Sequence, residues 1–489
     1  MHTLMLKLKT SKYQKMYLNR MFYITYKIYV ITAKYASKQL RLLRKDKRYK
    51  LLLKEYSNLK SKTLSKEEKE LFKSVKADLN DLIKSYNLTQ AGLYKFIKEQ
   101  QHLHRKTISS LQAQALADNI LTSVEKVLYS NGKSIHIKPF RKFNIISQKN
   151  MTNGLVLTSK GVKIFNQRMK ILYKNTDYEN ESLSSKCKYL ELKRIEFNGG
   201  YDFYINFVLE DAAPKKLEPG KCETGIDLGV STVAAVNKTA CIFEELAPKC
   251  KEYNLKIQRL QRLINLSTRT TNPELFNSDG TAKCGSKGKF KYSRHCKYLK
   301  RKLRVLYRKK SDYTLCLHSQ IINHLVRQTK IFKVEDMDFK ALAKRSKNTE
   351  RSDKPSKVNN ETVYKYKKKK RFGKSINDRS PGQFKKRLDE KCKQYNLEIN
   401  LLESKNFKFS QYNHDSNTYI KLPLSARKKM VNGCTVQRDL YSAYLISNVI
   451  DNKINRNKCK RNFNIFLINQ DKEIARRKAA RLKNPNFGM

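Results

Sequence analysis

Residues 223–236 read Glu-Thr-Gly-Ile-Asp-Leu-Gly-Val-Ser-Thr-Val-Ala-Ala-Val and are the reference point for the rest of the chain. The pattern predicts a β-strand, a tight glycine turn and a second strand. One carboxylate, Asp227, interrupts the apolar residues. An ionised Asp in an apolar strand is costly unless it is paired, hydrogen-bonded or bound to a metal. Alone, Asp227 is equally compatible with a turn or a helix cap.

Two later acids in similar settings favour a functional role for Asp227. Glu335 ends the predicted buried strand 330–338, and Asp439 lies in the first turn of the predicted helix 436–450. Carboxylates gathered at one sheet edge repel one another, so they require divalent cations between them. Mg²⁺ prefers such oxygen ligands, and two ions can activate water and stabilise the leaving oxygen of a phosphodiester. The three acids are therefore a candidate site for two Mg²⁺ ions, with Mn²⁺ as a possible substitute.

The charge of the chain indicates a polyanionic partner. The 489 residues include 105 Lys and Arg against 43 Asp and Glu, a net charge of +62. A protein this basic repels itself unless a polyanion neutralises it, and the extent of the charge favours a large nucleic-acid complex. The 39% hydrophobic content favours a folded protein. Because no signal peptide or membrane span is visible, we expect a cytoplasmic protein without a membrane partner.

The N-terminal half alternates between strand and helix patterns. Residues 4–10 alternate as an edge strand does, and residues 11–130 have a helical period. A capping box at 65–68 and Thr89 mark helix starts within this block. The period changes to two between 133 and 208, which predicts a β-barrel-like module that the N-terminal strand could complete. Its predicted strands are residues 134–138, 154–158, 162–165 and 201–208.

The C-terminal half predicts an α/β domain after a linker at 212–220. A long helix is expected from 298 to 329, before the strand that carries Glu335. Residues 341–380 are strongly basic, and we interpret them as a mobile loop that orders on a phosphate backbone. A solvated run of charge explains some of these side chains equally well. The basic residues 451–489 are expected to form a flexible tail outside the core.

Three motifs make the chain similar to a known family. Gly-Ile-Asp-Leu-Gly at 225–229, Val-Glu-Asp-Met-Asp at 334–338 and Gln-Arg-Asp-Leu-Tyr-Ser-Ala at 437–443 resemble, in order, the three RuvC motifs of TnpB. TnpB is the transposon-encoded family of RNA-guided nucleases that is ancestral to type V CRISPR effectors. The similarity spans about residues 1–450. It implies that Asp227, Glu335 and Asp439 are the catalytic acids.

The resemblance also implies a multi-domain α+β architecture. A helical recognition lobe would be inserted in a β-barrel wedge domain, and an RNase H-like (RuvC) α/β nuclease domain would follow. The implied boundaries are the wedge at 1–10 and 131–215, the recognition lobe at 11–130, the nuclease at 221–408 and 436–450, a zinc-ribbon-like insert at 409–435 and the tail at 451–489.

One departure from the family concerns zinc. Many relatives carry a four-cysteine zinc ribbon before the third motif, whereas residues 409–435 keep only His414 and Cys434 as potential ligands. Two ligands are too few for a structural zinc site. We therefore expect a degenerate, metal-free ribbon that can still contact the target nucleic acid.

The sequence thus predicts an RNA-guided DNA endonuclease. A guide RNA would pair with the target strand of double-stranded DNA, and the protein would recognise a short adjacent motif. We expect a monomer on one RNA, in the cytoplasm of a prokaryote and associated with the nucleoid. Alternatives that stay open are a type V CRISPR effector with a separate repeat-derived guide, a guided repressor that does not cut, and a resolvase without a guide.

Overall fold

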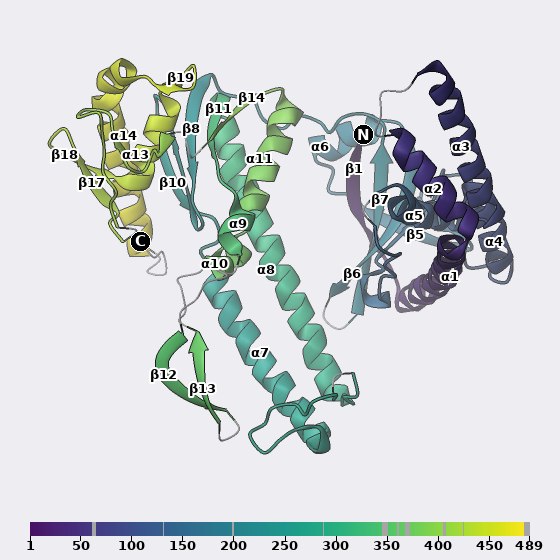
Figure 1. Cartoon of the computed structure of the whole chain (residues 1–489). Coiled ribbons are helices and arrows are strands. Elements are labelled where there is room, and N and C mark those ends of the chain that lie inside the picture. Colours follow the sequence, from purple (N-terminus) through teal and green to yellow (C-terminus); the bar gives the residue numbers. More distant parts are fainter. Residues whose placement is uncertain are drawn as a thin grey trace. The chain divides into compact units, whose positions relative to one another are not determined.

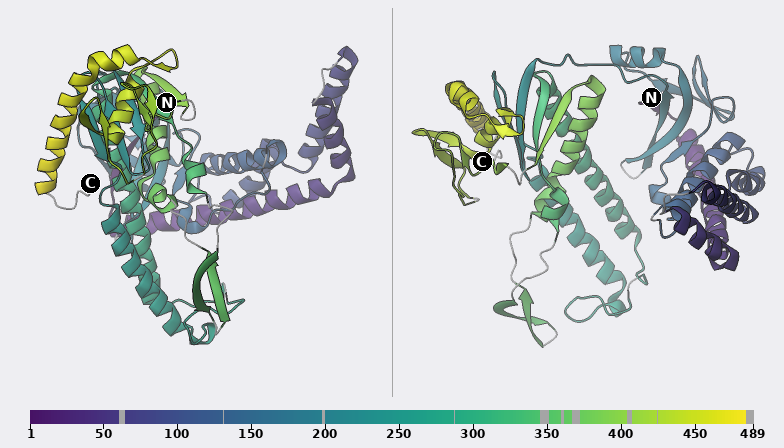
Figure 2. Two further views of the ribbon diagram at one scale, coloured as in Figure 1. Left: turned by 60° about the vertical axis from the view of Figure 1, so that its left-hand side comes forward. Right: turned by 45° about the horizontal axis from the view of Figure 1, so that its top comes forward.

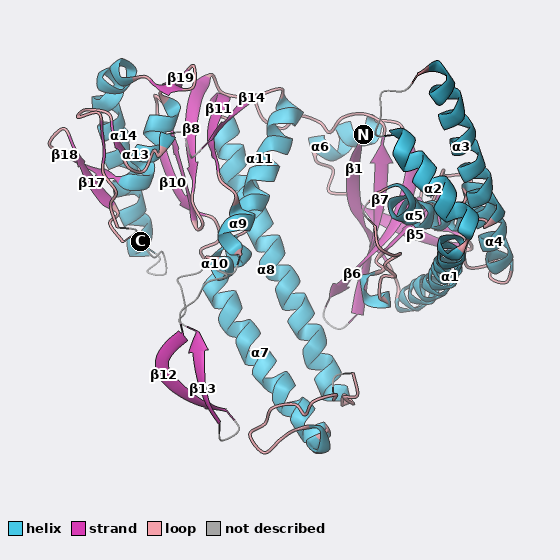
Figure 3. Ribbon diagram, in the orientation of Figure 1, coloured by secondary structure: helices cyan, strands magenta, loops and turns pink. Residues whose placement is uncertain are grey.

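The chain divides into two compact units, Met1–Pro214 and Lys215–Met489, and both combine helices and strands (Figure 3). The structure is a computed structural model. It describes the chain apart from residues 61–64, 131, 198–199, 287, 345–350, 359–360, 367–371, 404–406, 424 and 484–489. Each unit is described below by itself.

Within the described part of unit 1, seven strands form one open sheet, and β1, β5, β6 and β7 of this sheet are labelled in Figure 1. Their order is β2-β6-β7-β1-β5-β4-β3, and every neighbouring pair is antiparallel. The strands are β1 (His2–Lys9), β2 (Ile145–Ser147), β3 (Leu155–Thr158), β4 (Gly161–Ile164), β5 (Gln167–Leu172), β6 (Cys187–Phe197) and β7 (Gly200–Leu209).

The sheet corrects three expectations for unit 1. The first strand is central, not an edge, because β1 pairs with both β7 and β5. Its alternating burial is that of any antiparallel strand with one solvated face, so alternation cannot distinguish the two positions. Residues 134–138 form no strand, and β6 was not predicted.

The Gln148 side chain forms hydrogen bonds with both the carbonyl and the amide of Leu155, and these two bonds join the end of β2 to β3.

Helices of unit 1 lie between β1 and β2 in the sequence, as predicted. They are α1 (Lys12–Lys45), α2 (Lys47–Lys60), α3 (Lys66–Ser85), α4 (Gln90–His102) and α5 (Ser110–Tyr129), followed later by η1 (Phe140–Lys142) and α6 (Asp177–Ser184). The predicted starts are confirmed, because Ser65 and Glu68 form a capping box on α3 and the Thr89 side chain caps α4. Apolar residues of α1, α4 and α5 share one core with the sheet.

The central sheet of unit 2 has the order β10-β9-β8-β11-β14 among the described residues. Strands β8, β9 and β10 are antiparallel neighbours, whereas β11 is parallel to both β8 and β14. The strands are β8 (Cys222–Leu228), β9 (Thr232–Val236), β10 (Cys241–Glu245), β11 (Thr329–Asp336) and β14 (Glu398–Glu403). The strand, turn and strand predicted for 223–236 are therefore confirmed.

Helices pack on both faces of this sheet. On one face, α8 (Arg294–Val326) and α11 (Pro381–Tyr395) share a core with β8 and β11. On the other face lies α13 (Arg438–Ser447). Helix α7 (Cys250–Thr271) pairs with α8, and both extend beyond the sheet (Figure 2). The remaining elements in this region are η2 (Pro273–Leu275), α9 (Phe339–Ala343) and α10 (Gly373–Arg379).

Short hairpins complete the unit. They are β12 (Arg351–Val358) with β13 (Glu361–Tyr366), β15 (Tyr412–Asn413) with β16 (Thr418–Tyr419), β17 (Lys428–Val431) with β18 (Cys434–Gln437) and β19 (Val449–Ile450) with β20 (Lys453–Ile454). The basic loop expected at 341–380 thus contains α9, the β12–β13 hairpin and α10. The basic residues 367–371 lie outside the described part of the chain.

The C-terminal segment differs from the expected flexible tail. Residues Arg456–Lys483 form helix α14, and Cys459, Phe463 and Phe466 are buried in a core shared with α13. Burying these rings against α13 and β10 stabilises a helix that its basic composition does not predict. Across the described residues of both units, no helix combines the length and the apolarity that a membrane crossing needs.

Candidate active site

Two neighbouring parallel strands bring Asp227 and Glu335 together. The last aligned pair of β8 and β11 is Ile226 with Val334, and the next residue on each strand is one of the two acids. Both strands end within a residue of this point, so the carboxylates lie at the carboxyl edge of the sheet. Because side chains alternate between faces, both acids point to the same face as Gly225.

Gly225 shows which helix covers that face. A Cβ atom at Gly225 would lie 2.3 Å from the carbonyl oxygen of Ala443 and 2.3 Å from the amide nitrogen of Ser447, both on α13. The helix can therefore approach β8 this closely only because residue 225 has no side chain. Because Asp227 and Glu335 point to the same face of the sheet as Gly225, they also face α13.

The first turn of α13 supplies the third acid. Gln437 caps this helix, since its side-chain oxygen accepts the amide hydrogen of Leu440 at 2.6 Å. Asp439 lies in the first turn, and Ser442 follows three residues later on the same helix face. The Ser442 hydroxyl donates to the carbonyl of Arg438 at 3.1 Å, and Ser442 also lies close enough to Asp227 to lower its pKa, so this face of α13 is directed toward the end of β8.

The three predicted acids are thus close enough for their charges to interact. Burial raises the pKa of Asp227 well above its ordinary value, and the carboxylates of Glu335 and Asp439 raise this pKa further. The Arg438 guanidinium and the Ser442 side chain partly oppose this rise. A site that resists the ionisation of its own acid favours the binding of a cation.

Two arginines surround Asp439. Its carboxylate lies 3.7 Å from Nη1 of Arg427 and 3.5 Å from Nε of Arg438, and Nε2 of Gln437 donates to it at 3.5 Å. The Arg427 side chain is 64% exposed, whereas that of Asp439 is 18% exposed. Among the residues that the structure describes, no three His, Cys, Asp or Glu side chains are arranged as a metal-binding group. The three acids are thus near one another without forming a preassembled metal site, and it is their donor chemistry, oxygen only, that suits Mg²⁺.

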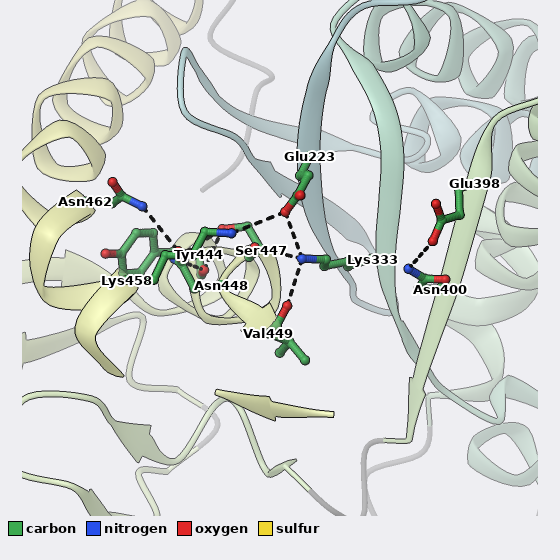
Figure 4. Close-up of polar contacts among 10 residues, drawn as sticks. All are labelled: Glu223, Lys333, Glu398, Asn400, Tyr444, Ser447, Asn448, Val449, Lys458 and Asn462. Atoms are coloured by element: carbon green, nitrogen blue, oxygen red, sulfur yellow. Dashed lines mark hydrogen bonds and ion pairs between the residues drawn. The ribbon is translucent and has the colours of Figure 1, made fainter. Parts of the chain in front are cut away.

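Lys333 fixes the other end of α13 (Figure 4). Its ammonium donates to Glu223 at 2.9 Å, to the carbonyl of Val449 at 2.8 Å and to the carbonyl of Ser447 at 3.5 Å. Lys458 also contacts Glu223, at 3.3 Å. A cation at the C-terminal end of a helix is favourable because the last carbonyls carry partial negative charge. Lys333, two residues before Glu335 on β11, therefore joins β8, β11 and α13.

The predicted ribbon remnant is held against α13 by buried polar groups. Nδ1 of His414 lies 2.7 Å from the Tyr441 hydroxyl, and burial lowers the pKa of His414 to about 4. The buried Lys429 ammonium donates to the carbonyls of Tyr412 at 2.7 Å and Gln411 at 3.1 Å. It thereby joins the β15–β16 and β17–β18 hairpins, and β18 carries Cys434. The absence of a structural zinc stays a prediction.

The acids next to Glu335 have other roles. Asp338 caps α9 by accepting the amide hydrogens of Lys340 and Ala341 at 2.9 and 3.0 Å. Asp336 forms an exposed ion pair with Lys385. Both acids therefore have partners other than the three predicted catalytic carboxylates.

Sequence reasoning missed the residues that support the acids. Ser442 could have been found, since it follows Asp439 by three residues and so shares its helix face. Lys333 could have been found as the residue two before Glu335, on the same strand face. No local signal indicates Arg427, because its contact with Asp439 depends on how the β17–β18 hairpin folds back onto α13.

Comparison with known proteins gives a weak structural similarity. No family model matches the chain, and no curated protein matches it. A cryo-EM structure of a Cas12f1–sgRNA–target DNA complex is similar with a TM-score of 0.41 and 13% identity, covering 91% of this chain and 98% of that chain. A CRISPR-Cas12f ternary complex gives a TM-score of 0.27 and 12% identity, covering 92% and 99%. Values this low do not assign the chain to that family.

Proposed function

We propose that this chain is an RNA-guided DNA endonuclease of the TnpB type, which cuts guide-complementary DNA beside a short adjacent motif. The observation that carries the proposal is that Asp227 and Glu335 follow the last aligned pair of β8 and β11 and face α13, the helix whose first turn holds Asp439. The carboxylates of Glu335 and Asp439 also raise the pKa of Asp227. Each acid belongs to one of three ordered motifs that resemble the RuvC motifs. Such a set is the chemistry that a metal-dependent nuclease requires.

The arrangement of strands and helices supports the domain assignment. In an RNase H-like nuclease domain, acids converge on adjacent parallel strands and a following helix, and unit 2 has such strands in β8 and β11 and such a helix in α13. Helices α1–α5 lie in sequence between the central strand β1 and the edge strand β2 of unit 1. This supports a helical recognition lobe inserted into a wedge domain.

The protein's own residues would prepare the site for chemistry. Asp227, Glu335 and Asp439 would hold two Mg²⁺ ions, which when bound would activate water and stabilise the leaving oxygen. Ser442 lies beside Asp227 on α13, and Lys333 holds the same helix, which carries Asp439. Arg427 and Arg438 balance part of the negative charge at Asp439.

Guide RNA and double-stranded target DNA are the proposed partners. One of the similar solved structures is a complex with sgRNA and target DNA. For this chain, the support is its net charge of +62, which an RNA–DNA hybrid would neutralise. We propose a monomer on one RNA, cytoplasmic and nucleoid-associated. A metal-free ribbon remnant at 409–435 would contact the nucleic acid.

The proposal is tested by purifying the protein from cells that carry its native locus. The bound RNA is sequenced, and the complex is then given Mg²⁺ and a plasmid library that matches this guide next to randomised sequence. We expect one class of bound RNA and cutting of plasmids with one adjacent motif. Asp227→Asn should abolish the cutting, whereas Glu390→Gln, at an exposed acid of α11, should leave it unchanged.

Other outcomes identify the alternatives. Specific RNA and DNA binding without cutting by the wild type would indicate a guided repressor. A guide derived from a repeat array would indicate a type V effector. Absence of any specific RNA would contradict RNA guidance and leave a resolvase or a general nuclease.

A further inference from the structure

A pocket of about 470 Å³ lies directly beside Asp439. Its walls come from α14, from the β17–β18 hairpin and from the β9 and β10 strands, and its lining includes Asp439, Phe243, Gln470 and Arg477. This volume is within the range of small-molecule sites and is large enough for one nucleotide. Of the three predicted catalytic acids, Asp439 is the one that lines the pocket.

Buried hydrogen bonds fix the pocket wall to the acid. The Gln470 side chain, 1% exposed, accepts the amide hydrogen of Gln437 at 2.7 Å, and Gln437 is the residue that caps α13. The Glu473 side chain, 5% exposed, accepts the amide hydrogen of Phe243 at 3.0 Å. Glu473 is also paired with Arg476 at 2.6 Å. Helix α14 is therefore held at a set position relative to both Asp439 and β10.

A flat cationic surface lies within the pocket. The Arg477 guanidinium covers the ring of Phe243, with 4.4 Å between the guanidinium carbon and the ring centroid. Burial lowers the pKa of Arg477, and nearby carboxylates, among them Glu244 and Glu473, oppose this change. A guanidinium stacked on an aromatic ring presents a planar surface, and unstacked nucleobases bind to such planes.

The charges in the pocket favour a base over a phosphate. Cationic Lys428 and Lys478 are exposed at its lining, but Glu245 and Asp471 also line it. Such mixed charge does not favour a second anion inside the pocket. A neutral base can use both kinds of group, because carboxylates accept hydrogen bonds from its amino groups while lysines contact the flanking phosphates.

We infer that this pocket binds one unstacked nucleobase, adjacent to the phosphate that the three carboxylates would cut. Stacking on Arg477 and Phe243 would then position the strand, so these two are positioning residues. The identity of the strand rests on the proposed function, but base binding can be measured without cutting. A base held next to the scissile phosphate fixes the register of the strand on the acids.

Photo-crosslinking tests this inference with the full-length protein. A short single-stranded DNA that contains 5-iododeoxyuridine is irradiated with the protein without divalent metal, and crosslinked peptides are mapped by mass spectrometry. We expect a crosslink within the pocket, at Phe243 or on α14. Base stacking predicts that Arg477→Lys, which keeps the charge but loses the plane, raises the half-saturating DNA concentration of this crosslink by about 5- to 100-fold.

Internal and matched controls make the result specific. Crosslinks elsewhere on the basic surface should keep their concentration dependence in Arg477→Lys. Tyr298→Leu removes a comparable pair on α8, where the Lys302 ammonium lies 4.6 Å from the Tyr298 ring, and it should leave the pocket crosslink unchanged. Phe243→Leu should raise the half-saturating DNA concentration of crosslinks on α14 as Arg477→Lys does, and only these crosslinks are compared because the substitution removes Phe243 as an acceptor.

Crosslinks that map only outside the pocket would overturn the inference, and so would a pocket crosslink that neither variant weakens. The crosslinking experiment is independent of the nuclease proposal, because it measures base binding and not cutting. A pocket crosslink that depends on Arg477, in a protein that never cuts DNA, would leave the base site standing and contradict only the proposed function.

Discussion

Replacing Gly225 with alanine should displace α13 from the sheet and misplace Asp439. The added Cβ would lie 2.3 Å from backbone atoms of Ala443 and Ser447, whereas ordinary contact begins at 3.4 Å. The helix must therefore retreat by about 1 Å, because backbone atoms cannot rotate away as a side chain can. Overpacking of this kind costs about 1–3 kcal/mol of the free energy of unfolding. A displacement of about 1 Å at a catalytic group can lower the rate about 100-fold.

Two measurements examine this prediction. Chemical denaturation of Gly225→Ala gives the loss in free energy of unfolding, and single-turnover cleavage gives the loss in rate. The matched control is Gly382→Ala on α11, where the nearest atom to an added Cβ is a Phe339 ring carbon at 4.0 Å. That control should be neutral or stabilise by up to about 1 kcal/mol, since alanine favours a helix over glycine.

The outcome that refutes the reasoning is a Gly225→Ala protein with wild-type stability and cleavage rate. It would mean that α13 does not rest on β8 at residue 225. The argument that Asp439 reaches Asp227 through this contact would then fail as well.

Three further predictions concern single side chains. The folded-state pKa of Asp227 is raised, so ionisation of this side chain opposes folding. The metal-free wild type should therefore lose stability as pH rises above about 4. Asp227→Asn should lack this loss when denaturation is measured at several pH values. The pKa of Lys429 is lowered from 10.5 to about 8 by burial, so the free energy of unfolding should rise between pH 8 and 10.5, and Lys429→Met should abolish this rise. Phe466 is 2% exposed and stacks on Tyr444 with 4.5 Å between the ring centroids. Calorimetry of Phe466→Ala should show a loss of about 3–5 kcal/mol in the free energy of unfolding. The control Ile468→Ala, at a 55% exposed position, should change this free energy by less than about 0.5 kcal/mol.

The sequence was informative wherever the signal is local. The turn after Asp227, the capping box at 65–68 and the cap at Thr89 depend on residues a few positions apart, and all three are present in the structure. The strand that carries Asp227 was predicted from an apolar run that this acid interrupts, and the strand that carries Glu335 from an apolar run that ends in acids. Their parallel alignment, which brings the two acids level, is a tertiary property that no local pattern contains.

Helix α14 shows why the tail was misjudged. One face of the helix is buried at positions spaced by four and three residues, but only the first three of these are apolar and the last two are polar; they are Cys459, Phe463, Phe466, Gln470 and Glu473. The two polar members are buried because Gln437 and Phe243 supply amide hydrogens to them. Such partners are distant in the sequence, so composition alone indicated a solvated basic segment. The pocket beside Asp439 was missed for the same reason.

Single-turnover cleavage by the three acid variants tests the central claim most directly. Asp227→Asn, Glu335→Gln and Asp439→Asn are compared with the triple variant and with Glu390→Gln in Mg²⁺, on guide-matched DNA. If the three carboxylates act as one metal site, each single variant should lose as much activity as the triple variant, because groups that act as a unit are not additive. A single variant that keeps a rate near that of the wild type would contradict the account.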